Sequence, residues 1–164
     1  MVSDACFADN GSMTAKTSSG AAPKKGGQDR HYRVVLADDH RELRLWLKRE
    51  LEDGTDLKVV GEADDGLELL ELLGPGGLQP DMAIVDISMP RLGGIETARK
   101  IKRRYPDVKV LIMTVHNDGE YLDEAIAAGA EGYLLKGDAG LELFMAIEMI
   151  RRGGIYLSPR IENG

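Results

Sequence analysis

Residues 82–94 read MAIVDISMPRLGG: a short apolar run, 82–85, ends on Asp86, and a proline and two glycines follow. An apolar run of this length bounded by turn residues predicts a strand that is buried on both faces of a sheet. An Asp after such a strand commonly caps the following turn. Asp86 therefore takes a chemical role only if other parts of the chain bring partners to it.

Strand and helix patterns alternate on both sides of this segment. We predict further strands at 33–37, 58–63, 109–114 and 132–136, and helices at 40–53, 65–74, 94–106, 119–130 and 140–154. Strict alternation predicts right-handed crossovers, and hence an α/β fold with a doubly wound, five-stranded parallel sheet and helices on both faces.

The chain divides into three parts by composition. Residues 1–31 are rich in Gly, Ser, Thr, Ala and Lys without an apolar period, which predicts a disordered tail. Residues 32–155 form the predicted folded domain. Residues 156–164 are expected to be a C-terminal stub, or the start of a linker to a missing output domain.

The charge and the cysteine content of the chain exclude several classes of function. The net charge is −7, and the first 32 residues contribute +1, so the remainder carries −8. An acidic body repels a phosphate backbone, so we expect this chain alone not to bind nucleic acid. No apolar run reaches the roughly 18 residues of a membrane helix. The single cysteine, Cys6, excludes an internal disulfide and a cysteine metal cluster, and a reducing cytoplasm is the expected location.

Polar residues stand at the ends of four predicted strands. Asp38 and Asp39 follow the strand at 33–37, Asp86 ends that at 82–86, Thr114 that at 109–114, and Lys136 that at 132–136. The carboxyl ends of parallel strands share one edge, where ligands bind. Taken singly, each residue has an ordinary explanation as a cap, a strand residue or a solvated charge. Their joint placement favours a site.

The chemistry of this set suits phosphoryl transfer. Three carboxylates repel one another unless a cation is present, and oxygen ligation favours Mg²⁺. Asp86 can then attack a phosphoryl group, while Lys136 and the hydroxyl of Thr114 hold the transferred oxygens. His40 and His116 flank the site without metal-ligand spacing, and we expect them to be polar loop residues.

The segments LADDH, VDISMPRLGGIETARKI, VLIMTVH and GYLLKGD resemble the response-regulator receiver domain of two-component signalling, over about Arg33 to Pro159. Within that family, DISMPRLGGIE, GAEGYLLK and GGIYLSP resemble the LuxR-type, nitrate-regulator-like class. The resemblance implies a flavodoxin-like (βα)5 fold. It also implies that Asp86 is phosphorylated, and that Asp38, Asp39, Asp86 and the main-chain carbonyl of Ser88 bind Mg²⁺.

The resemblance also implies a conformational switch. Thr114 matches the switch hydroxyl, Lys136 the lysine of the motif, and Tyr133 the aromatic residue that rotates inward on activation. Gly137 departs from the many receivers that have proline after this lysine.

The function implied is a receiver that accepts a phosphoryl group from a histidine kinase and switches a partner-binding surface. It is no enzyme beyond its own phosphorylation and dephosphorylation, and a phosphorylation-dependent homodimer is expected. The alternative is the receiver fragment of a LuxR-type DNA-binding transcriptional regulator. A flavin-binding protein is disfavoured because ADDH would repel phosphate after the first strand. An aspartyl phosphatase is disfavoured because Ser88 stands where its second Asp is usual.

The expected switching surface spans 119–130, 132–136 and 140–152. The last helix has two apolar stripes, one of Leu141, Phe144 and Met145 and one of Leu143, Ile147 and Ile150. One stripe is expected to cover the sheet and the other to be free for a partner.

Overall fold

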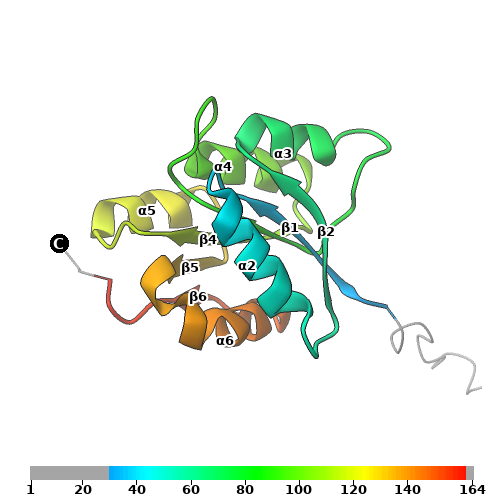
Figure 1. The fold of residues 1–164 in the computed structure, drawn as a ribbon. Helices are drawn as coiled ribbons and strands as arrows, with labels where there is room; N and C mark the ends of the chain where they lie inside the picture. The colour runs from blue at the N-terminus through cyan, green and yellow to red at the C-terminus, as the bar shows by residue number, and fades with distance from the viewer. Residues whose placement is uncertain (1–29, 162–164) are drawn as a thin grey trace, which may run out of the picture. The chain divides into compact units, whose positions relative to one another are not determined.

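The computed structural model describes residues 30–161 (Figure 1). Its strands are β1 (Tyr32–Ala37), β2 (Leu57–Ala63), β3 (Met82–Val85), β4 (Lys109–Thr114), β5 (Gly132–Leu135) and β6 (Tyr156–Leu157). Its helices are α2 (Arg41–Glu52), α3 (Gly66–Leu72), α4 (Gly94–Arg104), α5 (Gly119–Ala127), α6 (Ala139–Arg151) and the short 3-10 helix η2 (Lys136–Asp138). Residues 1–29 of the predicted tail, with Cys6, lie outside the described residues.

All strands of the sheet are parallel, in the order β2-β1-β3-β4-β5-β6. This confirms the predicted doubly wound fold. The sheet has six strands instead of the five predicted, because Tyr156 and Leu157 pair with Gly132 and Tyr133 of β5. A strand of two residues shows no alternating pattern, so its sequence gives no signal.

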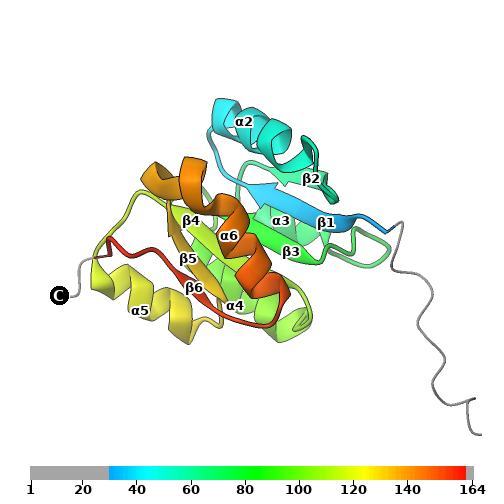
Figure 2. The same ribbon diagram turned by 90° about the horizontal axis from the view of Figure 1, so that it is seen from below.

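Helices cover both faces of the sheet, with α2 and α6 on one side and α3, α4 and α5 on the other (Figures 1 and 2). Successive residues of β4 alternate between the two cores. Val110 and Ile112 pack on the side of α3, α4 and α5, while Leu111 and Met113 pack on the side of α2 and α6. The continuous apolar strands therefore serve two cores, as the sequence predicted.

A glycine brings α4 close to the end of β3. A Cβ atom at Gly94 would lie 2.0 Å from the main-chain oxygen of Asp86, so this first residue of α4 must be glycine. The Gly94 N–H donates to the Ile87 carbonyl at 2.9 Å. The loop between Asp86 and α4 is thus folded back tightly on the end of its own strand.

The two stripes of α6 separate as predicted. Leu143, Ile147 and Ile150 are at most 1% exposed and pack on the sheet. Leu141, Phe144 and Met145 are 93%, 42% and 53% exposed. Among the described residues, no helix combines the length and the apolar character that crossing a bilayer requires.

Candidate functional site

The ends of β1, β3 and β5 bring three of the predicted residues into contact. Asp86 lies directly beside β1, because its N–H donates to the carbonyl of Ala37 at 2.9 Å. The Nζ atom of Lys136 lies 2.8 Å from Asp38 Oδ2 and 3.4 Å from Asp86 Oδ2. One ammonium group therefore bridges two carboxylates that come from separate strands.

Burial is the largest influence on the pKa of Asp86. The residue is only 4% exposed, and this burial raises the pKa of its carboxyl group. The Lys136 ammonium opposes the rise, and the Asp38 carboxylate adds to it. Repulsion between carboxylates, which the sequence suggested, is thus a smaller cause than desolvation. A further cation beside Asp86 would favour its charged, nucleophilic form.

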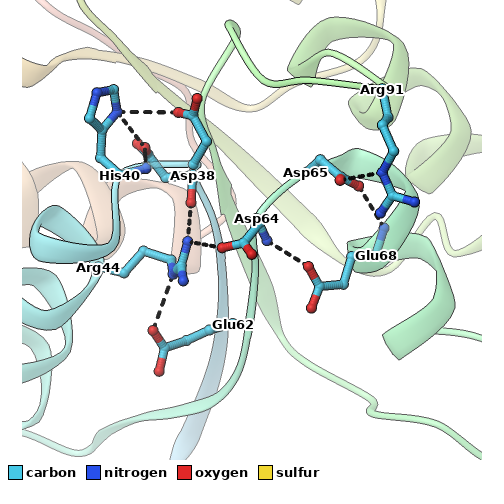
Figure 3. Close-up of polar contacts among 9 residues, drawn as sticks. Asp38, His40, Arg44, Glu62, Asp64, Asp65, Glu68 and Arg91 are labelled. Carbon is cyan, nitrogen blue, oxygen red and sulfur yellow. Dashed lines mark hydrogen bonds and ion pairs between the residues drawn. The ribbon is translucent and has the colours of Figure 1, made fainter.

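Asp38 and Asp39 gather with a histidine at the end of β1. One possible ligand atom from each of Asp38, Asp39 and His40 lies within 4.8 Å of the others. His40 Nδ1 is 3.2 Å from both carboxylates (Figure 3). The expectation that His40 is a plain loop residue missed this contact, for which the only sequence signal is its position directly after the acidic pair. Asp86 is linked to this group through Lys136.

The donor set fits a hard divalent cation. Carboxylate oxygens of Asp38, Asp39 and Asp86 are the ligands that Mg²⁺ prefers, and together they carry more negative charge than Lys136 neutralises. The side chain of His40 is 68% exposed, so its ring would have room to turn toward solvent if a cation occupied these oxygens.

His116 connects the other predicted residues. Its main-chain N–H donates to Thr114 Oγ1 at 3.3 Å, and its main-chain carbonyl accepts from the Tyr133 hydroxyl at 2.8 Å. Its ring atom Nε2 lies 2.9 Å from Ser88 Oγ. The ring of His116 also packs on Tyr121, with centroids 4.4 Å apart. The sequence placed this histidine in a loop but gave no sign of these contacts.

Thr114 and Tyr133 are both buried, at 0% and 1% exposure. Burial raises the pKa of the Tyr133 phenol, which keeps its hydroxyl protonated and able to donate. In this structure the Tyr133 side chain therefore points inward, with its hydroxyl held by the loop that follows Thr114.

The loop after Asp86 is held against α3. Arg91 has a φ angle of 62°, in the left-handed region that non-glycine residues rarely adopt. Its Nε donates to Asp65 Oδ2 at 2.6 Å, a contact visible in Figure 3, and this hydrogen bond lowers the pKa of Asp65. Beside it, the Gly66 N–H donates to the Leu92 carbonyl at 3.1 Å.

The segment that contains β6 reaches the same end of the sheet. Ser158 is 3% exposed, its N–H donates to the Tyr133 carbonyl at 2.9 Å, and its Oγ accepts from the Leu135 N–H at 2.9 Å. Arg160 then forms an ion pair with Asp138 of η2. Residues after α6 are thus bonded to the strand that carries Tyr133.

The chain matches the family Response regulator receiver domain over residues 34–155. It is 40% identical over 129 residues to the response regulator GacA of Pseudomonas viridiflava, covering 79% of this chain and 59% of GacA. Among solved structures, it is similar to a LuxR-family two-component response regulator from Aurantimonas sp. SI85-9A1. That similarity has a TM-score of 0.75 and 35% identity, and covers 80% of this chain and 92% of that one.

A second similar structure is the isolated REC domain of RcsB from Salmonella enterica serovar Typhimurium, solved with the phosphomimetic BeF3-. Its TM-score is 0.73 at 27% identity, with 80% of this chain and 96% of that one covered. RcsB has also been solved as two dimers bound to two parallel DNAs.

The protein belongs to the response regulator receiver domain family. Within it, the similarity is to LuxR-type regulators, as the sequence motifs predicted. The chain spans 54% to 60% of the length of the curated relatives it matches.

Proposed function

We propose that this receiver accepts a phosphoryl group on Asp86, with Mg²⁺ held by Asp38, Asp39, Asp86 and the main-chain carbonyl of Ser88. The observation that carries the proposal is the position of Lys136, whose Nζ lies 2.8 Å from Asp38 and 3.4 Å from Asp86. A cation within reach of a buried carboxylate favours the ionised form of that carboxylate and supplies charge to an incoming phosphoryl group.

The chemistry follows from these groups. A carboxylate oxygen of Asp86 attacks phosphorus, the bond from phosphorus to the donor breaks, and the donor leaves with that electron pair. Mg²⁺, when bound by these residues, would supply positive charge at the phosphoryl oxygens. Lys136 neutralises one of these oxygens, and the Thr114 hydroxyl donates a hydrogen bond to another. Catalysis here consists mainly of positioning and charge neutralisation. The only reaction catalysed in this proposal is the protein's own modification.

The proposed physiological donor is the phosphohistidine of a sensor kinase in the cytoplasm. Phosphorylation would draw Thr114 toward the new charge and change its contact with His116, which also holds Tyr133. This change would bias the surface of α5, β5 and α6. The exposed stripe of Leu141, Phe144 and Met145 is the surface we assign to a second copy, consistent with the dimers of RcsB.

Residues 32–155 are the proposed phosphoacceptor domain. The greater length of the relatives favours a second candidate, in which this receiver is one part of a LuxR-type DNA-binding transcriptional regulator. The net charge of −7 remains our reason for proposing that this chain alone does not bind nucleic acid.

The decisive test is phosphorylation by acetyl phosphate, followed by intact-protein mass spectrometry. One phosphoryl group should be added with Mg²⁺ and none with EDTA, and Asp86→Asn should abolish the addition. Asp81→Asn, at the opposite end of β3, is the matched control and should be labelled like wild type. Labelling that persists in Asp86→Asn would place the acceptor elsewhere.

The switch needs its own measurement. Apparent mass in solution should change when beryllofluoride and Mg²⁺ are added, and Thr114→Ala should remove that change. If mass and amide exchange over residues 113–150 both stay constant, the domain does not switch and the proposed signalling role fails.

A further inference from the structure

A buried arginine lies behind the acidic pair at the end of β1. Arg44, the fourth residue of α2, has a side chain that is only 10% exposed. Its Nε lies 3.3 Å from Glu62 Oε1 and its Nη1 lies 2.6 Å from Asp64 Oδ1, both at the end of β2 (Figure 3). Nη1 also donates to the main-chain oxygen of Asp38.

The contact with the Asp38 carbonyl has a specific consequence. This oxygen belongs to the peptide unit that joins Asp38 to Asp39, so Arg44 holds the peptide plane between the two acidic residues. On the other side, the Asp38 N–H donates to the Ala63 carbonyl at 3.1 Å. The main chain of Asp38 is therefore fixed at both ends, once from β2 and once from α2.

Asp39 depends on this restraint more than Asp38 does. The Asp38 carboxylate is 4% exposed and is held by Lys136, whereas the Asp39 side chain is 39% exposed and its ion-pair partner is the exposed ring of His40. The direction of the Asp39 side chain is thus set mainly by the main-chain conformation at this residue. A guanidinium suits this task because its planar fork serves a carbonyl and two carboxylates at once.

We propose that Arg44 is a positioning residue for the divalent cation site, acting through the Asp38–Asp39 peptide and not by contact with the ion. The inference rests on the proposed function, since it concerns the same Mg²⁺ site. It goes further by assigning the geometry of that site to a residue of α2 that is bonded to the end of β2.

Charge and geometry predict opposite results when Arg44 is replaced. By charge alone, removing a cation next to the acidic pair would strengthen the binding of Mg²⁺, because like charges repel. By positioning, the same change would weaken binding, since loss of a supporting group around a metal ligand typically costs about 10- to 100-fold in affinity. The direction of the change therefore separates the two roles.

The experiment is a ¹H–¹⁵N NMR titration of the full chain with MgCl₂, following the Asp39 amide. Arg44→Met should weaken Mg²⁺ binding by about tenfold or more, and Arg44→Lys, which keeps the charge but not the fork, by a smaller factor. The matched control is Arg151→Met, which removes a helix arginine bonded to Asp56 and should leave Mg²⁺ binding unchanged.

Each outcome has a defined meaning. A folded Arg44→Met protein that binds Mg²⁺ as tightly as wild type, or more tightly, overturns the inference. If that variant does not fold, Arg44→Lys decides, and unchanged affinity in it rejects the positioning role. A wild-type chain that shows no Mg²⁺ binding, or whose binding survives Asp39→Asn, would instead count against the proposed function.

Discussion

The anchoring of β6 by Ser158 gives a sharp quantitative prediction. In Ser158→Ala the N–H of Leu135 loses its acceptor at a buried position. A buried donor left without a partner costs about 1–3 kcal/mol. For a domain of this size, that loss corresponds to a fall in melting temperature of about 3–10 °C.

The assay is urea denaturation, combined with amide exchange at Leu135. Ile155→Ala is the matched control, because Ile155 precedes β6 and is 63% exposed, and this change should stay within about 0.5 kcal/mol of wild type. Exchange at Leu135 should accelerate only in Ser158→Ala. If that variant is as stable as Ile155→Ala and exchanges like wild type, β6 is not anchored to β5 through this hydroxyl.

Three further predictions test other parts of the molecule. Arg91 lowers the pKa of Asp65 below its ordinary value of 3.8, so the pair stabilises the fold above that pH and loses this contribution as pH falls through the lowered pKa. Arg91→Gln should therefore reduce the free energy of unfolding at pH 7, and denaturation at decreasing pH should show the difference from wild type shrinking below 3.8; a constant difference would contradict this. Leu143→Ala should cost about 2–5 kcal/mol in urea denaturation, whereas the exposed Phe144→Ala should cost less than about 1 kcal/mol; equal losses would mean that the two stripes are assigned wrongly. Removing residues 1–30 should move the thermal transition by no more than about two degrees, and a calorimetric loss of several degrees would show that the tail packs on the domain.

The sequence alone was sufficient to predict the fold and to predict which residues share an edge of the sheet. Apolar runs alternating with helical patterns determine a doubly wound parallel sheet, and such a sheet brings all its carboxyl strand ends together. Asp38, Asp86 and Lys136 could be placed on one edge for that reason alone. The two stripes of α6 followed from helical periodicity, which is a local property of the chain.

The contacts within the site came from the tertiary structure. Lys136 reaches both Asp38 and Asp86 because β1 and β3 are neighbours and β5 lies two strands further along, and sequence order does not show that arrangement. The burial of Asp86, which is the main cause of its raised pKa, likewise depends on what packs around the strand end. The sequence suggested charge repulsion because composition shows charges but not desolvation.

Arg44 and Ser158 show most clearly what the sequence alone left undecided. Arg44 looks like a surface residue of an amphipathic helix, and Ser158 lies in a segment expected to be a stub. Both are buried. Their hydrogen-bond partners lie on β2 and β5, which are distant from them along the chain. Periodicity describes which face a residue occupies within its own element. Which polar group of another element meets it there depends on strand order, register and side-chain conformation, and these exist only in the folded molecule.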